Sequence, residues 1–169
     1  MSEPRKKHSV RFWATAISLS ALTAVSIYAT NTRWAIAIAP QEHLCLPPYR
    51  VWLIDKADTA PVQGEIFAFR SVGLEPVFPD GTTIVKVLEG MPGDQVVVTA
   101  EQTTINGRTV ATGLDVAASR GIAPGRYERE GQIAEGRYWF FGRTADSFDS
   151  RYWGSVGADQ IKGRAYPIW

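Results

Sequence analysis

Two kinds of hydrophobic pattern divide the chain. From Phe12 to Thr32, about 21 residues carry no charge, and as a helix this run spans roughly 30 Å, the thickness of a bilayer's hydrocarbon core. Beyond the run, short β-branched and aromatic stretches alternate with Gly, Pro, Asn and Asp, which is typical of strands and turns. We therefore expect one transmembrane helix over residues 12–32 and a mainly antiparallel β domain over residues 36–169.

The β domain consists of short apolar runs that each predict one strand or one hairpin. These runs cover residues 51–54, 65–70, 82–88, 95–99, 104–110, 137–141 and 161–165. Asn106-Gly107 lies inside one of them and predicts a tight hairpin turn. Residues 111–134 are polar and contain glycine, so they predict an exposed insertion or long loop.

Basic residues precede the apolar helix. Arg5, Lys6, Lys7 and Arg11 give the tail of residues 1–11 a charge of about +3, whereas the whole chain carries +1. The positive-inside rule then predicts a cytoplasmic N-terminus and an extracytoplasmic β domain, with the chain in the inner (plasma) membrane.

A cleavable signal peptide is the alternative interpretation of this region. Ala37-Ile38-Ala39 has the small-x-small pattern of a cleavage site, but Pro40 follows it directly and the apolar run is long. A third interpretation, a buried core helix, is disfavoured because the polar residues of the run form no amphipathic stripe. We therefore favour an uncleaved membrane anchor.

Composition excludes several classes of protein. The chain of 169 residues is 45% hydrophobic and 21% charged, unlike disordered or collagenous sequences, and its net charge of +1 predicts no nucleic-acid partner. The single cysteine, Cys45, excludes an intramolecular disulfide, and two histidines, His8 and His43, make a histidine-rich metal centre improbable. We expect neither a metal nor another cofactor.

Lys86 lies inside the strongly β-branched run 82–88. Its strand neighbours on both faces are apolar, and desolvation disfavours an ammonium ion, so a neutral amine able to act as a general base is one interpretation. By the pattern alone, the commoner arrangement is a lysine on the solvent side of an edge strand, or one that extends its amine to water.

Cys45 stands among leucines, ahead of Pro47-Pro48. A lone cysteine is most often a small buried apolar residue, but an unpaired thiol outside the cytoplasm suggests either a role as a nucleophile or a disulfide between two chains. His43 is two residues away and shares a strand face with Cys45 if the segment is extended. A Cys–His pair at this spacing rarely reaches hydrogen-bond geometry, so a surface histidine is the alternative.

A third candidate region lies near the C-terminus. Asp149 and Arg151 can pair across a turn, and Ser147 can donate to or accept from a nearby amine. Taken alone, this region predicts a structural loop with an ion pair that stabilises the protein by roughly 0–1 kcal/mol if exposed.

Taken in order, these segments resemble the type I signal peptidase family and, within it, the TraF-type peptidases of conjugation systems. Residues 86–94, Lys-Val-Leu-Glu-Gly-Met-Pro-Gly-Asp, resemble the lysine box of the family. Residues 147–156, Ser-Phe-Asp-Ser-Arg-Tyr-Trp-Gly-Ser-Val, resemble its C-terminal box. Residues 45–49, Cys-Leu-Pro-Pro-Tyr, match the stretch that carries the family's nucleophile.

The resemblance implies coiled antiparallel β-sheets like those of signal peptidases and LexA-like proteases. It implies that Cys45 occupies the position of the nucleophilic serine, with Lys86 as its base, Ser147 orienting Lys86, and Asp149 pairing with Arg151. His43 replaces the Ser or Thr that helps to bind the oxyanion, and Arg143-Thr144 replaces the usual Asp-Asn after Gly142.

The function so implied is that of a membrane-anchored endopeptidase. It would cleave a membrane-associated precursor, a conjugative pilin above all, after small residues through a Cys–Lys acyl-enzyme, and acyl transfer to an amine would cyclise the product. Two alternatives remain. One is a catalytically impaired homologue that works with other pilus or secretion components as an assembly factor, and the other is an unrelated anchored β domain used for binding.

Overall fold

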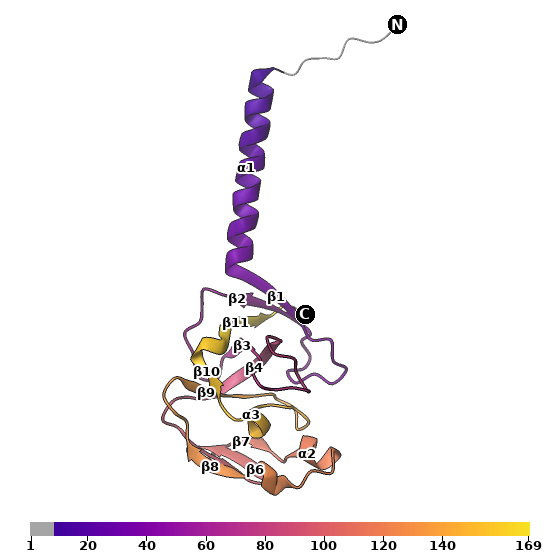
Figure 1. The fold of residues 1–169 in the computed structure, drawn as a ribbon, viewed down its shortest axis with the longest axis vertical. Helices are drawn as coiled ribbons and strands as arrows, with labels where there is room; N and C mark the ends of the chain where they lie inside the picture. Colours follow the sequence, from indigo (N-terminus) through magenta and orange to yellow (C-terminus); the bar gives the residue numbers. More distant parts are fainter. Residues whose placement is uncertain (1–8) are drawn as a thin grey trace. The chain divides into compact units, whose positions relative to one another are not determined.

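The structure is a computed structural model that describes residues 9–169, and the chain forms two compact units, one ending at Trp34 and one of residues Ala35–Trp169. Arg5, Lys6 and Lys7 of the predicted basic tail lie outside the described residues. The fold is mainly β with one long N-terminal helix, as predicted (Figure 1).

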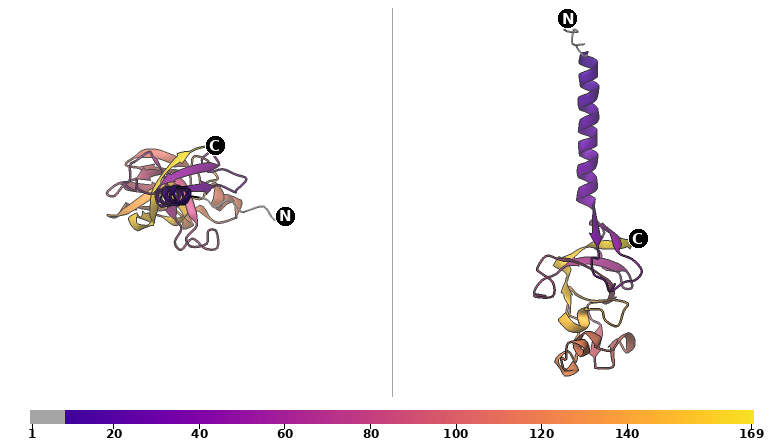
Figure 2. Two further views of the ribbon diagram at one scale, coloured as in Figure 1. Left: turned by 90° about the horizontal axis from the view of Figure 1, so that it is seen from above. Right: turned by 90° about the vertical axis from the view of Figure 1, so that its right-hand side faces the viewer.

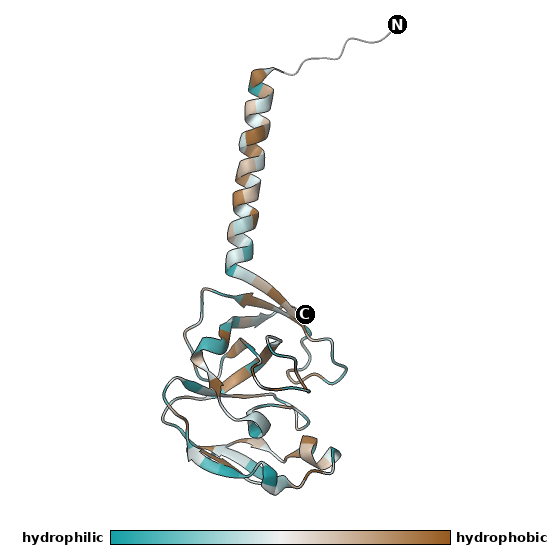
Figure 3. Ribbon diagram, viewed as in Figure 1, coloured by the Kyte–Doolittle hydropathy of each residue, from teal (hydrophilic) through white to brown (hydrophobic). Residues whose placement is uncertain are grey.

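Helix α1, Val10–Arg33, covers the predicted apolar segment. The Ser9 hydroxyl accepts a hydrogen bond from the Phe12 N–H at 3.3 Å and caps the helix. Apolar residues recur along its whole length (Figure 3), and none of its residues is buried. Within residues 9–169 it is the one helix long and apolar enough to cross a membrane.

A seven-stranded antiparallel sheet forms the larger part of residues 35–169. The strand order is β1-β2-β11-β3-β4-β9-β10. The strands are β1 (Trp34–Ile38), β2 (Val51–Asp55), β3 (Ile66–Arg70), β4 (Thr83–Gly90), β9 (Arg137–Phe141), β10 (Val156–Gly157) and β11 (Ile161–Pro167). The short helix α3, Ser150–Trp153, and the 3-10 turn η2, Ala158–Gln160, lie between β9 and β11.

A four-stranded sheet of order β7-β6-β5-β8 forms the other part. Its strands are β5 (Gln95–Val98), β6 (Gln102–Ile105), β7 (Arg108–Thr112) and β8 (Arg129–Gln132). Asn106 and Gly107 both have positive φ, at 51° and 78°, which confirms the predicted hairpin turn between β6 and β7. Figure 1 shows this sheet and helix α2, Asp115–Ser119, at the end of the domain away from β2 and β11.

The central strands of the larger sheet are buried on both faces. On β3, Phe67 and Phe69 pack on one face and Ala68 on the other, and all three are fully buried. On β4, Leu88 and Val87 divide in the same way. Residues of β4 thus contribute to hydrophobic clusters on both sides of the sheet. This explains why apolar residues occur on both faces of the 82–88 run. Figure 2 shows the domain from two further sides.

One segment differs from the sequence-based expectation of an exposed insertion or long loop. Residues 111–134 form α2, the 3-10 turn Pro124–Arg126 and β8, and Leu114, Ala117 and Ile133 are buried in the core of the four-stranded sheet. Their spacing among polar residues hides this role. The segment after α1 is strand β1, in which exposed Ile36 and Ile38 alternate with half-buried alanines.

Candidate active site

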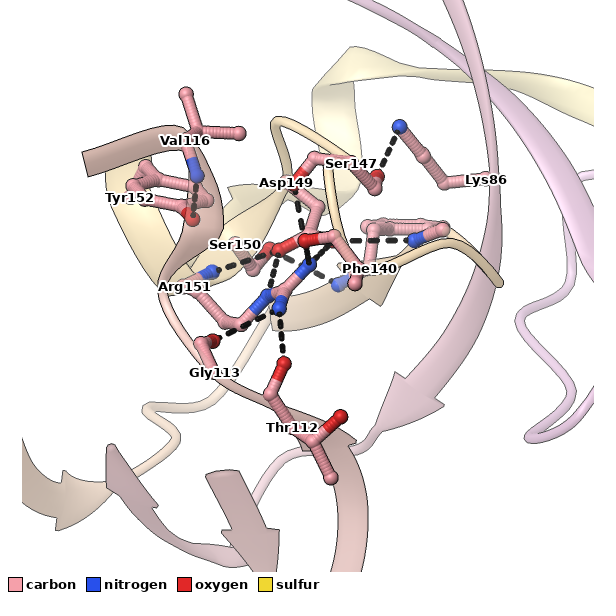
Figure 4. A network of polar contacts seen from close by, with 12 residues as sticks. Lys86, Thr112, Gly113, Val116, Phe140, Ser147, Asp149, Ser150, Arg151 and Tyr152 are labelled. Atoms are coloured by element: carbon pink, nitrogen blue, oxygen red, sulfur yellow. Dashed lines mark hydrogen bonds and ion pairs between the residues drawn. The ribbon is translucent and has the colours of Figure 1, made fainter. Parts of the chain in front are cut away.

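Lys86 is buried in the middle of β4. Its side chain is 2% exposed, and its Nζ donates a hydrogen bond of 2.7 Å to Oγ of Ser147, which is fully buried (Figure 4). Within the described residues, no carboxylate forms an ion pair with Lys86. The solvent-facing lysine that the pattern alone favours is therefore wrong. Lys86 lies on the same face of β4 as Ile84 and Leu88, which pack against the aromatic core.

Ser147 is held by a buried ion pair in the loop that connects β9 to α3. The Arg151 guanidinium binds Asp149 through two parallel hydrogen bonds, Nε to Oδ1 and Nη2 to Oδ2, each 2.9 Å long. Both side chains are at most 1% exposed. The same guanidinium donates to the carbonyl oxygen of Ser147 at 3.1 Å, so the ion pair fixes the backbone next to the lysine's partner (Figure 4).

The guanidinium also reaches the other sheet. Arg151 Nη1 donates to the carbonyl oxygens of Thr112 and Gly113, at the end of β7, both at 3.0 Å. Burial alone would lower the pKa of Arg151, but the hydrogen bond and the charge of Asp149 outweigh it, and the pKa lies above its ordinary value. Arg151 is thus a permanent cation that links the end of β7 in the four-stranded sheet to the loop that carries Ser147.

Cys45 lies in the loop between β1 and β2. It is half-buried, and its carbonyl oxygen accepts a hydrogen bond of 2.7 Å from the N–H of Arg143. The next residue, Leu46, is buried in the core and anchors the loop. Cys45 and Lys86 both line a cavity of about 490 Å³, whose walls are mostly apolar. The structure therefore brings the candidate nucleophile and the candidate base to one cavity from different parts of the chain.

His43 has a different environment. Its side chain is 84% exposed, and its Nδ1 lies 3.9 Å from an oxygen of Asp146, a surface residue on the Ser147 loop. Among the described contacts there is no hydrogen bond between His43 and Cys45. This arrangement matches the surface histidine that the sequence left as an alternative, and the proposed role of His43 in oxyanion binding gains no support.

Two further residues shape the site, Ser150 within the C-terminal motif and Gly142 five residues before it, and the sequence alone did not reveal the role of either. Ser150, fully buried, accepts a hydrogen bond of 2.9 Å from the N–H of Phe140 through its Oγ and so ties α3 to β9. Gly142 contacts Ser147 so closely that a Cβ at this position would overlap the Ser147 side chain and come within 3.0 Å of the Cys45 carbonyl oxygen. Only a glycine allows both loops to approach.

The described residues hold no group of three or more His, Cys, Asp and Glu side chains able to bind a metal ion. The chemistry available at the site is that of a thiol, a buried amine and hydroxyl groups. A thiol and an amine that share a mainly apolar cavity are suited to acyl transfer, with the sulfur as nucleophile and the amine as base.

The family match agrees with this arrangement. The structure combines a mainly β domain of curled antiparallel sheets, a buried lysine hydrogen-bonded to a serine, and a long apolar helix before the domain. The model of the family described as "Signal peptidase, peptidase S26" matches residues 10–169, so the chain belongs to the S26 signal peptidase family.

One solved structure similar to this chain is a signal peptidase I from Enterococcus faecalis. It is 26% identical, and the alignment covers 62% of this chain and 96% of that chain, with a TM-score of 0.40. No curated protein matches the chain.

Replacing Arg151 by Met should lower the free energy of unfolding by about 3–5 kcal/mol, because Asp149 would stay buried without its counter-charge. The measurement is urea unfolding of the full chain in detergent micelles. Arg126→Met, at an exposed arginine, should change stability by less than about 0.5 kcal/mol. If the two substitutions lower the free energy of unfolding equally, the buried Asp149–Arg151 pair does not contribute to stability as predicted.

Gly142→Ala should destabilise the protein by about 1–3 kcal/mol, since the new methyl group must displace Ser147 or the Cys45 loop. The same unfolding measurement applies. Gly131→Ala is the matched control, because a Cβ there has no atom within 4 Å and its φ is not positive. If Gly142→Ala is as stable as Gly131→Ala, the close approach of the two loops is not a constraint.

Proposed function

We propose that this chain is a membrane-anchored endopeptidase in which Cys45 is the nucleophile and Lys86 the general base. The observation that carries the proposal is the buried Lys86 amine, held by Ser147 and without a carboxylate partner among the described residues, in the same cavity as Cys45. An amine that faces a thiol across one cavity, and whose place is fixed by a hydroxyl partner, is suited to accept the thiol proton during the reaction.

The substrate would bind as an extended segment along β4. Strand β3 pairs with β4 over Thr83–Val87, whereas β9 pairs with it only from Val87 onward. The other edge of the segment before Val87 therefore has no strand partner in the described sheet, and it borders the cavity. A peptide added there would gain backbone hydrogen bonds, while small side chains before the scissile bond would fit the apolar walls.

The reaction would proceed through a thioester. Lys86 accepts the Cys45 proton as the sulfur attacks the scissile carbonyl carbon, and the backbone N–H of Cys45 would donate a hydrogen bond to the oxyanion that forms. Collapse of the tetrahedral intermediate breaks the C–N bond, and Lys86 returns the proton to the leaving amine. Lys86 then deprotonates the second nucleophile, whose attack on the thioester releases the Cys45 sulfur.

Helix α1 would anchor the enzyme where its substrates are. We place the N-terminus in the cytoplasm and residues 35–169 outside it, at the inner membrane, from the basic residues that precede the helix. The substrate we propose is a membrane-associated precursor, a conjugative pilin. With water as the second nucleophile the product is linear, and with the substrate's own amino group it is a circle.

Cys45→Ala and Lys86→Met should each reduce processing of a co-expressed pilin precursor by at least about a thousandfold, because each removes one half of the reacting pair. Cys45→Ser should retain measurable processing, because the hydroxyl is a weaker nucleophile that the same lysine can activate. Gel mobility of the precursor over time provides the measurement, and near-UV circular dichroism shows that the variants are folded.

Normal processing by both Cys45→Ala and Lys86→Met would overturn the proposal. It would favour the alternative of a catalytically impaired homologue that assists pilus or secretion assembly. That alternative predicts that pilus formation survives both substitutions.

Intact-mass spectrometry of the processed pilin should distinguish the two outcomes of the second step. A product lighter than the trimmed linear form by one water shows cyclisation, since amide formation from the thioester adds no water. A product at the linear mass rejects acyl transfer and leaves hydrolysis. The precursor co-expressed with the Cys45→Ala variant gives the unprocessed reference mass.

A further inference from the structure

A second cavity, of about 410 Å³, adjoins the candidate active site. The first cavity is lined by β4 as far as Lys86, and the second is lined by β4 from Val87 onward. Gly142 and Arg143 form part of the second wall, and the Arg143 N–H is hydrogen-bonded to the Cys45 carbonyl oxygen. The linings of the two cavities are therefore contiguous along β4, where Lys86 is followed by Val87, and through the hydrogen bond between Arg143 and Cys45.

The two cavities differ in chemistry. The walls of the first are mainly apolar, with Ile36, Leu44 and Trp52 among them. Those of the second carry hydroxyl and charged groups from the edge strand β7, from Glu89 and from the Arg143-Thr144 pair. The Thr144 Oγ1 is buried and has no hydrogen-bond partner in the part of the chain that the structure describes. An apolar segment suits the first cavity and a polar segment suits the second.

Among the charged side chains that line the second cavity, Arg143 is the one without an ion-pair partner in the described residues. Glu89 is neutralised by Arg108, with 3.0 Å between Oε2 and Nη2, and Arg151 is neutralised by Asp149. Arg143 has an exposed side chain, and no carboxylate of residues 9–169 lies within ion-pair distance of it.

Asp146 is the nearest acidic residue along the same loop. Its carboxylate faces His43, and it is not among the residues that line the second cavity. The free guanidinium of Arg143 is thus the net charge that this cavity presents to a bound peptide.

We propose that the second cavity binds the part of the substrate that follows the scissile bond, and that Arg143 selects an acidic side chain there. This inference rests on the proposed function, because it takes Cys45 and Lys86 as the point of cleavage. The apolar first cavity receives the small residues before the bond. Beyond Lys86 an extended chain passes the edge of β7 and the Arg143 side chain, at about 3.3 Å per residue. Arg143 is a specificity residue and takes no part in the chemistry.

The test measures binding, so that it does not depend on turnover. The probes are two fluorescently labelled peptides, Leu-Leu-Ala-Leu-Ala-Asp-Gly-Ser and the same peptide with Lys in place of Asp. They are titrated by anisotropy into the full-length Cys45→Ala variant in detergent. We expect the Asp peptide to bind about threefold more tightly, the size of an exposed ion pair, with a preference that declines as salt is added.

Charge reversal is the decisive variant. Arg143→Glu in the Cys45→Ala background should invert the preference, so that the Lys peptide binds about threefold more tightly. Arg143→Gln should abolish the preference without inverting it. Arg126→Glu makes the same charge change at an exposed position away from the cavity, and it should leave the preference for Asp intact.

The outcomes separate this inference from the proposed function. Equal affinities for the two peptides, an unchanged preference in Arg143→Glu, or no binding of either peptide overturn the assignment of the second cavity. Failure of the proposed function would instead appear as normal pilin processing by Cys45→Ala and Lys86→Met, and the peptide preference could still be measured in that case.

Discussion

The buried ion pair between Asp149 and Arg151 is the interaction on which the rest of the site depends. A charged pair with both members at most 1% exposed is costly to desolvate, and it is stable only when its remaining donors and acceptors are satisfied. Here the guanidinium also binds carbonyl oxygens from the end of β7 and from Ser147. One side chain thereby fixes the smaller sheet against the loop that holds the lysine.

The position of Lys86 follows from that constraint and from the sheet. Lys86 lies between the buried residues Ile84 and Leu88 on one face of β4, so its side chain is only 2% exposed. Its amine needs at least one polar partner, and the Ser147 hydroxyl, held in place through Arg151, supplies it. A network that is structural in origin thus presents an amine to the cavity that also contains Cys45.

The local pattern of apolar and polar residues predicts most of the strands and the long helix. It does not predict burial that depends on residues distant in the sequence. The uncharged run, the β-branched strands and the Asn106-Gly107 turn are visible as sequence because each reflects a local preference of the backbone. The burial of Leu114 and Ala117 was not visible, because these residues are isolated among polar ones and face the core only after β5, β6 and β9 have assembled. The exposed position that the strand pattern alone predicts for Lys86 is wrong for the same reason, since the pattern of one strand does not show what covers its faces.

The sequence by itself determined a long apolar helix, a β domain and two motifs that resemble those of signal peptidases, because these depend on residue order and local periodicity. The tertiary structure decided which polar groups meet. It placed Ser147 against Lys86, which lies 61 residues earlier, directed His43 to the surface, and separated an apolar cavity from a polar one. These relations arise from long-range strand pairing and from the satisfaction of buried charges, and neither is encoded within any single segment of the chain.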